Sequence, residues 1–130
     1  MLLLVLACSG DTKDTGGDTA AAEPTFTRVQ TEIYTPSCAF SSCHGSTGPA
    51  QGLDLSEGIA WGATVEVPSQ LDPMSVMVKP GDPDHSFLYR KCAADPTAIG
   101  SPMPDGASTG LDSERLALLR DWITAGALDN

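Results

Sequence analysis

The chain has few aromatic side chains and few basic ones. Aromatic residues make up only 5% of its 130 positions, so a large core built from rings is not available. Seven Lys and Arg stand against 17 Asp and Glu, for a net charge of -10, which argues against a nucleic-acid-binding face and against electrostatic docking to an anionic membrane. The sequence also lacks a run of about 20 apolar residues, so no segment is predicted to span a bilayer.

Glycine, proline and cysteine are plentiful by comparison. Thirteen Gly and ten Pro disfavour helix and strand interiors, and they predict that much of a single small domain is loop. Long ordered loops need something besides sheet hydrogen bonds to organise them. The four cysteines, Cys8, Cys38, Cys43 and Cys92, are the candidates for that role.

The N-terminus divides into two segments ahead of the domain. Residues 1–8 are an apolar run that ends at Cys8 and resembles a signal-peptide remnant with the lipobox of bacterial lipoproteins. This resemblance implies lipidation at Cys8 and an exported protein of the periplasm or cell envelope, anchored to a membrane; a buried N-terminal strand is the alternative. Residues 9–24 are acidic and lack large apolar side chains, which predicts a disordered tether.

The remaining residues, 25–130, are predicted to form one all-α domain of three to four short helices with long ordered loops. Apolar residues at helical spacing after Thr25 indicate a first helix that Pro36 ends. Asp112 is a suitable N-cap for a last helix over 113–125. Pro83 favours a helix from there to about Lys91, and residues 56–64 could contain a fourth.

The residues with the strongest chemical signal are Cys38, Cys43 and His44. Covalent haem attachment requires two thiols followed directly by a histidine, usually with two residues between the thiols. Here the spacer has four residues, which demands a bulged loop. Met103, which lies 59 residues after His44 and is followed by Pro104, is presented from a Pro-rich loop and is the candidate for a second axial ligand of the iron.

Several motifs in this order resemble the small cytochrome c domains of exported bacterial proteins. They are the Cys38-x4-Cys43-His44 motif, Gly52-Leu-Asp-Leu55, the segment from Lys79 to Tyr89, Met103-Pro104, and Trp122 to Ala127. The resemblance implies a cytochrome c-like fold around haem c, with its first and last helices crossing. It also implies thioether bonds at Cys38 and Cys43, with His44 as proximal and Met103 as distal iron ligand.

The expected function is therefore single-electron transfer by a monohaem c-type cytochrome without enzymatic activity. The acidic surface favours a redox partner protein with a basic docking surface, and no nucleic-acid partner is expected.

Alternatives remain at several residues. Cys92 is either a free thiol or a disulfide partner of Cys38, and a haem-free, disulfide-stapled interaction module on the same scaffold is the competing interpretation. Zinc would need Cys92 or His85 as a further ligand. Met103 could instead fill a turn. Four basic residues are candidates for pairing with haem propionates, although solvated helix faces are their default: Arg90, Lys91, Arg115 and Arg120.

Overall fold

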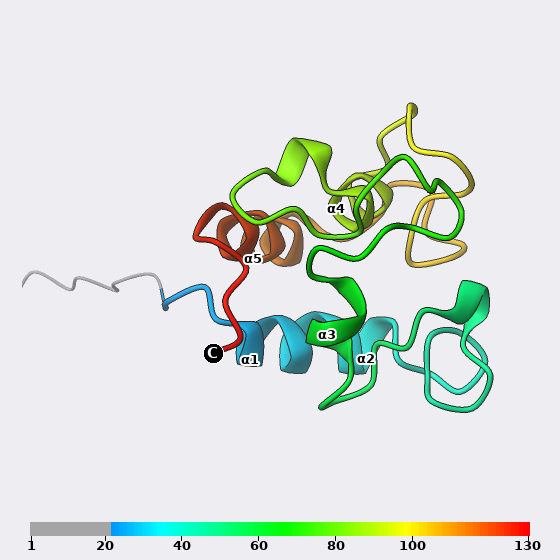
Figure 1. The fold of residues 1–130 in the computed structure, drawn as a ribbon, viewed down its shortest axis with the longest axis horizontal. Coiled ribbons are helices and arrows are strands. Elements are labelled where there is room, and N and C mark those ends of the chain that lie inside the picture. The colour runs from blue at the N-terminus through cyan, green and yellow to red at the C-terminus, as the bar shows by residue number, and fades with distance from the viewer. Residues whose placement is uncertain (1–21) are drawn as a thin grey trace, which may run out of the picture.

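The structure is a computed structural model that describes residues 22–130 (Figure 1). The expected signal segment with Cys8, and the expected tether up to residue 21, lie outside the described residues. None of the helices from residue 22 onward is long and apolar enough to cross a membrane.

The described part of the chain is helical, as predicted. Its extended segments meet only in isolated bridges, such as the one between Val65 and Val78. The α- and π-helical segments are α1 (Phe26–Val29), the π-helical η1 (Gln30–Tyr34), α2 (Thr35–Ser37), α3 (Ala60–Thr64), α4 (Phe87–Cys92) and α5 (Ser113–Thr124). Two 3-10 turns, η2 (Ala50–Gly52) and η3 (Pro83–His85), complete the set.

The first helix is continuous through α1, η1 and α2, and it differs from the prediction in two ways. It widens into a π-helix, in which the Thr35 N–H donates to the carbonyl of Gln30. It also passes Pro36 and ends at Ser37. Pro36 follows directly after the π-turn, and the helix continues for one residue beyond it.

The second and third predicted helices form with shifted bounds. The segment expected to be helical from Pro83 splits into η3 and α4, because Ser86 between them adopts an extended conformation. Phe87 and Leu88 face inward, as predicted. The helix considered for 56–64 is confirmed only over Ala60–Thr64.

The last helix is confirmed almost to the residue. The Asp112 carboxylate accepts a hydrogen bond from the Arg115 backbone N–H at 3.0 Å, which is the expected N-cap. Gly126, with φ of 112°, follows the C-cap. Four apolar side chains of α5 are buried: Leu118, Leu119, Trp122 and Ile123.

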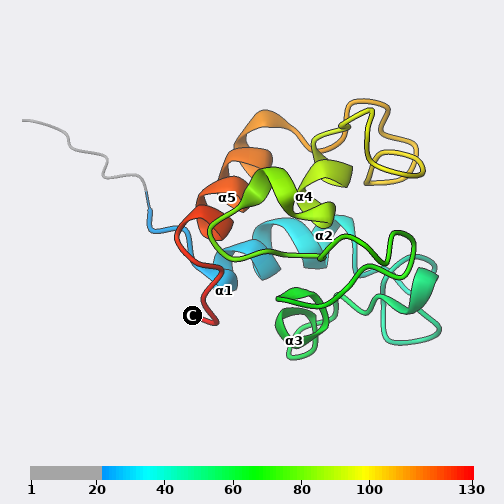
Figure 2. The same ribbon diagram turned by 45° about the horizontal axis from the view of Figure 1, so that its top comes forward.

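The core lies where α1 and α5 meet. The ring of Phe26 packs against Trp122 with centroids 5.4 Å apart and against Tyr34 with centroids 6.1 Å apart. The C-terminus returns to the start of α1, where the Phe26 N–H donates to the side chain of Asn130 at 2.9 Å. Figures 1 and 2 show the helices gathered at this side, while the long loops extend toward the other.

Candidate functional site

The four-residue spacer between Cys38 and Cys43 forms a closed loop at the end of the first helix. The Phe40 carbonyl accepts from the N–H groups of both Cys43 and Gly45, each at 2.9 Å. The His44 N–H donates back across the loop to the Cys38 carbonyl at 3.0 Å. These bonds bring the second cysteine and the histidine back beside the first, so the expected bulged loop has a defined conformation.

Gly45 is required by this closure. A Cβ at position 45 would lie 2.8 Å from the Phe40 carbonyl oxygen, closer than side-chain carbons approach backbone. Gly45 is itself buried. The loop can therefore close only because the residue after His44 has no side chain.

The imidazole of His44 is held in one tautomer. Its Nδ1 lies 3.1 Å from the backbone carbonyl oxygen of Leu53, and a carbonyl can only accept, so the proton resides on Nδ1. This leaves Nε2 as a free lone pair, the state in which a histidine ligates a metal. Backbone contacts between the same segments, such as the Leu55 N–H with the His44 carbonyl at 2.8 Å, fix the ring's position.

The cysteines, the histidine and Met103 line one cavity of about 600 Å³. Its walls come from residues 34–55 on one side and 100–105 on another, with further residues from 63–71, 77 and 87–92. In both views the loops around 40–55 and 95–110 lie on opposite sides, below and above (Figures 1 and 2). The volume falls in the range of small-molecule and cofactor sites, about 300–1,000 Å³.

All three cysteines of the described residues are free thiols. Burial raises the pKa of Cys38 to about 11, with the Cys43 thiol as a second cause. Burial, and then proximity to Cys38, raises the pKa of Cys92 further. Both thiols are therefore neutral near pH 7. Cys92 is 5% exposed and is part of the cavity lining.

Tyr34 is a cavity residue that the sequence did not single out beyond its place on the helix. Its side chain is 1% exposed, and among residues 22–130 its hydroxyl has no partner at hydrogen-bonding geometry, although the Thr64 side chain is close enough to affect its pKa. Burial is the main cause that raises the pKa of this phenol. A buried hydroxyl without a partner is costly, and this one lies at the wall of a cavity able to receive a ligand. Only the three-dimensional arrangement could have identified it.

The second-ligand candidate, Met103, is half-buried at the cavity wall, and its backbone N–H donates to the Lys91 carbonyl at 3.0 Å. Met77 also lines the cavity, from an extended segment bound at both sides by backbone hydrogen bonds. Met74 is 95% exposed and lies outside it. The structure thus brings two methionines, not one, to the same space.

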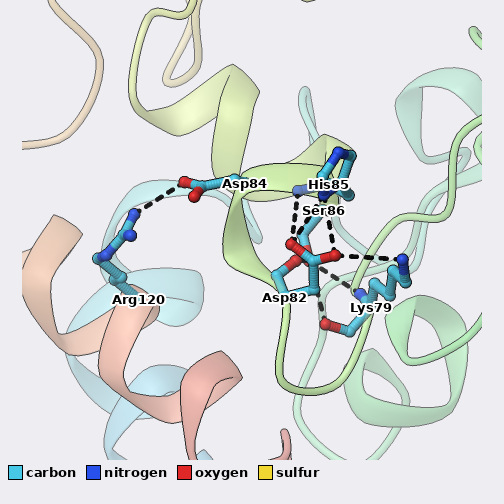
Figure 3. A network of polar contacts seen from close by, with 6 residues as sticks. All are labelled: Lys79, Asp82, Asp84, His85, Ser86 and Arg120. Atoms are coloured by element: carbon cyan, nitrogen blue, oxygen red, sulfur yellow. Dashed lines mark hydrogen bonds and ion pairs between the residues drawn. The ribbon is translucent and has the colours of Figure 1, made fainter.

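His85 is not brought to the cavity. It lies on η3, mostly exposed, with Nδ1 2.8 Å from a carboxylate oxygen of Asp82 (Figure 3). The Asp82 carboxylate also contacts Lys79 Nζ at 3.1 Å, and these two partners hold its pKa below the usual range. Among residues 22–130, no group of three or more His, Cys, Asp or Glu side chains is arranged to hold a bare metal ion, which gives the zinc interpretation no support.

The residues around the cavity fit a large apolar group with a polar edge. The lining is mainly apolar, and two thiols and an oriented imidazole lie on one short loop at its wall. The hydroxyl of Tyr34 offers a polar contact that residues 22–130 do not use. This donor set is the one that covalent haem requires: two thiols and a histidine with its Nε2 free.

Comparison with protein-family models, with curated proteins and with solved structures gives no match to the chain. Residues 22–130 therefore define the class as a helical, loop-rich domain with an apolar cavity lined in part by thiols, an imidazole and thioethers.

Proposed function

We propose that the chain is a monohaem c-type cytochrome that carries single electrons in the bacterial cell envelope. The observation that supports this most strongly is the meeting of Cys38, Cys43, His44 and Met103 at one cavity, with the Nδ1 proton of His44 already committed to Leu53. Haem c, when bound, supplies a one-electron couple at its iron.

Each residue has a distinct role in this proposal. Cys38 and Cys43 would hold the porphyrin through thioether bonds, and His44 Nε2 and the Met103 sulfur would be the two protein ligands of the iron. The Leu53 carbonyl orients the imidazole and raises its basicity. The apolar lining excludes water, which favours the less charged state of a redox centre.

The setting of the domain follows from the sequence. Lipidation at Cys8 would anchor the chain in the envelope, and residues 9–24 would act as a tether. The net charge of -10 favours a redox partner with a basic docking surface. The competing proposal, a haem-free interaction module stapled through Cys38, would require disulfide formation among thiols that are free in this structure.

The proposal is tested by producing the full chain together with cytochrome c maturation enzymes. We expect a covalent haem that survives denaturation, a mass increase of one haem per chain, and loss of both in Cys38→Ala with Cys43→Ala. Thiol counting after denaturation should then find one free cysteine in the domain, Cys92. A colourless protein of unmodified mass would overturn the proposal, and a chain without free thiols would favour the stapled module.

The two cavity methionines provide a matched pair for the distal ligand. Met103→Ala should lower the reduction potential and open a coordination site to added imidazole or cyanide, because a thioether ligand is lost. Met77→Ala removes the same side chain from the same cavity and should leave the ligand-field spectrum unchanged. The reverse result would assign the ligand to Met77.

A further inference from the structure

Lys91 is a buried basic residue that has no carboxylate partner among residues 22–130. It lies on α4 and is 8% exposed. Each of the other five basic residues in the described range lies within 4.0 Å of a carboxylate, in the pairs Arg28–Glu32, Lys79–Asp82, Arg90–Asp95, Arg115–Asp112 and Arg120–Asp84. The most deeply buried cation is thus the one that the described part of the chain leaves without a counter-charge.

The ammonium group is fixed at the cavity wall. Nζ donates to the Ile99 carbonyl at 3.0 Å and lies 5.9 Å from the ring centroid of Phe87. A Cβ at Gly100 would lie 2.8 Å from Nζ, so a glycine makes room for this position. The Lys91 ammonium group has three N–H donors and uses one of them on the Ile99 carbonyl, so it can donate to a further acceptor in the cavity.

The charged and titratable groups near Lys91 do not supply that acceptor. The Cys92 thiol is buried and neutral near pH 7, and Asp105, exposed at the cavity edge, lies outside ion-pair distance. Burial lowers the pKa of Lys91, while Cys92 and Asp105 oppose this effect. A buried charge in these surroundings is stabilised when a ligand brings an opposite charge.

We propose that Lys91 binds a carboxylate of the ligand that occupies the cavity. The identity of that ligand rests on the proposed function, under which the group is a propionate of the haem. Of the four basic residues that the sequence made candidates for such a contact, three already pair with the chain's own carboxylates: Arg90, Arg115 and Arg120. Lys91 remains.

The pairing has a consequence for the reduction potential and its dependence on pH. A nearby cation offsets the negative charge of a propionate and keeps that propionate ionised. Without this cation, the uncompensated propionate stabilises the oxidised centre, and the pKa of the propionate rises. Lys91→Met should therefore shift the ratio of oxidised to reduced protein at fixed potential by about tenfold toward the oxidised form, which is 59 mV for one electron. A pH-dependent step should also appear between about pH 5 and 8.

The test compares the holoproteins of three variants by redox titration across that pH range. Lys91→Met should show both effects, Lys91→Arg should resemble the wild type, and Lys79→Met is the matched control because it removes the same charge from an exposed site. If Lys91→Met behaves like Lys79→Met, the proposal is wrong. A changed ligand-field spectrum in Lys91→Met would place Lys91 on the iron and would also overturn it.

Two further outcomes are informative. If Lys91→Met holds no haem while Lys91→Arg does, a positive charge at position 91 is required and the proposal is supported. If neither variant holds haem, the shape of the lysine side chain is required and the proposal fails. A colourless wild type overturns the proposed function instead. In that case, unfolding of the ligand-free chain tests whether the charge of Lys91 lacks a partner. Lys91→Met should then stabilise the fold and lower the unfolding equilibrium constant about tenfold. An unchanged or higher constant means that the charge is already satisfied.

Discussion

The helical side of the molecule and the loop side are stabilised in different ways. Where α1, η1 and α5 meet, large side chains are almost fully buried, among them Trp122, Ile33 and Leu119 at 1% exposure or less. Around the cavity, residues 38–55 and 93–111 are held mainly by backbone hydrogen bonds and by glycines with positive φ. The helical side has a core of its own, while the loop side surrounds the cavity.

This difference explains how a chain with so few aromatic residues can fold. Three of the seven aromatic rings, those of Phe26, Tyr34 and Trp122, form one cluster at the helix crossing. The loop side has no comparable cluster and would gain its apolar interior from the ligand. We therefore expect damage to the two sides to have different effects.

The largest loss should follow damage to the helical side. Trp122→Ala removes a ring that is 1% exposed and packed against Phe26, and it should reduce the free energy of unfolding by about 4 kcal/mol. Urea unfolding of the full chain measures this. Met74→Ala, at a side chain that is 95% exposed, is the control and should change stability by less than about 0.5 kcal/mol. Similar losses in both variants would contradict the placement of the core.

Damage to the loop side should cost less free energy of unfolding but should reduce attachment of the proposed haem. Gly110 has φ of 74°, and a Cβ there would collide with the Cys92 carbonyl oxygen, which accepts from the Leu111 N–H at 2.9 Å. Gly110→Ala should lower the free energy of unfolding by about 3 kcal/mol, from left-handed strain plus overpacking.

Gly106 offers a matched control for that variant in the same loop. It has φ of 84° but open space around it, so Gly106→Ala should cost only about 1 kcal/mol. The yield of covalent haem should fall in Gly110→Ala and not in Gly106→Ala. Equal costs would mean that the close approach to Cys92 is not maintained in solution.

Cys38, which follows the first helix and begins the loop side, should make the free energy of unfolding sensitive to alkaline pH. The pKa of Cys38 is 9.0 in an unfolded chain and is raised by burial to about 11, so the folded state keeps its proton longer. The stability due to this thiol is complete below pH 9 and is lost as pH rises through 11, by at most about 2.7 kcal/mol for two pKa units.

The measurement is urea unfolding of the ligand-free chain between pH 8 and 10.5. Cys38→Ala should show a shallower decline than the wild type, because the proton-linked contribution is gone. Lys91, whose pKa is lowered by burial, acts with the opposite sign just below pH 10.5, so the difference between the two proteins is the relevant quantity. Parallel declines would show that the Cys38 thiol is not buried.

The sequence predicted the helical side better than the loop side. The Asp112 cap and the apolar stripe of α5 are local signals, and both are present as expected. The apolar spacing of the first helix was also correct, but its π-turn and its passage through Pro36 were not foreseen. A π-turn depends on tertiary packing and has no composition of its own.

At the cavity, the cysteine–histidine motif, the Pro-rich loop and the resemblance to cytochrome c domains predicted that Cys38, Cys43, His44 and Met103 belong to one site, and the structure brings them to one cavity. Whether they bind haem remains a prediction. The unsatisfied hydroxyl of Tyr34 could not be read from the sequence, and Lys91 was one of four basic candidates that the sequence could not rank. Both distinctions depend on which side chains of residues 22–130 lie nearby.

The π-helical turn of η1 sets the direction in which the first cysteine points. One residue advances an α-helix by about 100° around its axis, and η1 contains Gln30 to Tyr34 just ahead of Cys38. A π-turn takes up one more residue than an α-turn, so an ordinary α-helix formed by the same residues would rotate Cys38 by up to about 100° relative to Phe26 and Val29. The wider turn therefore decides on which side of the core the cysteine motif begins, although the number of residues between them is the same.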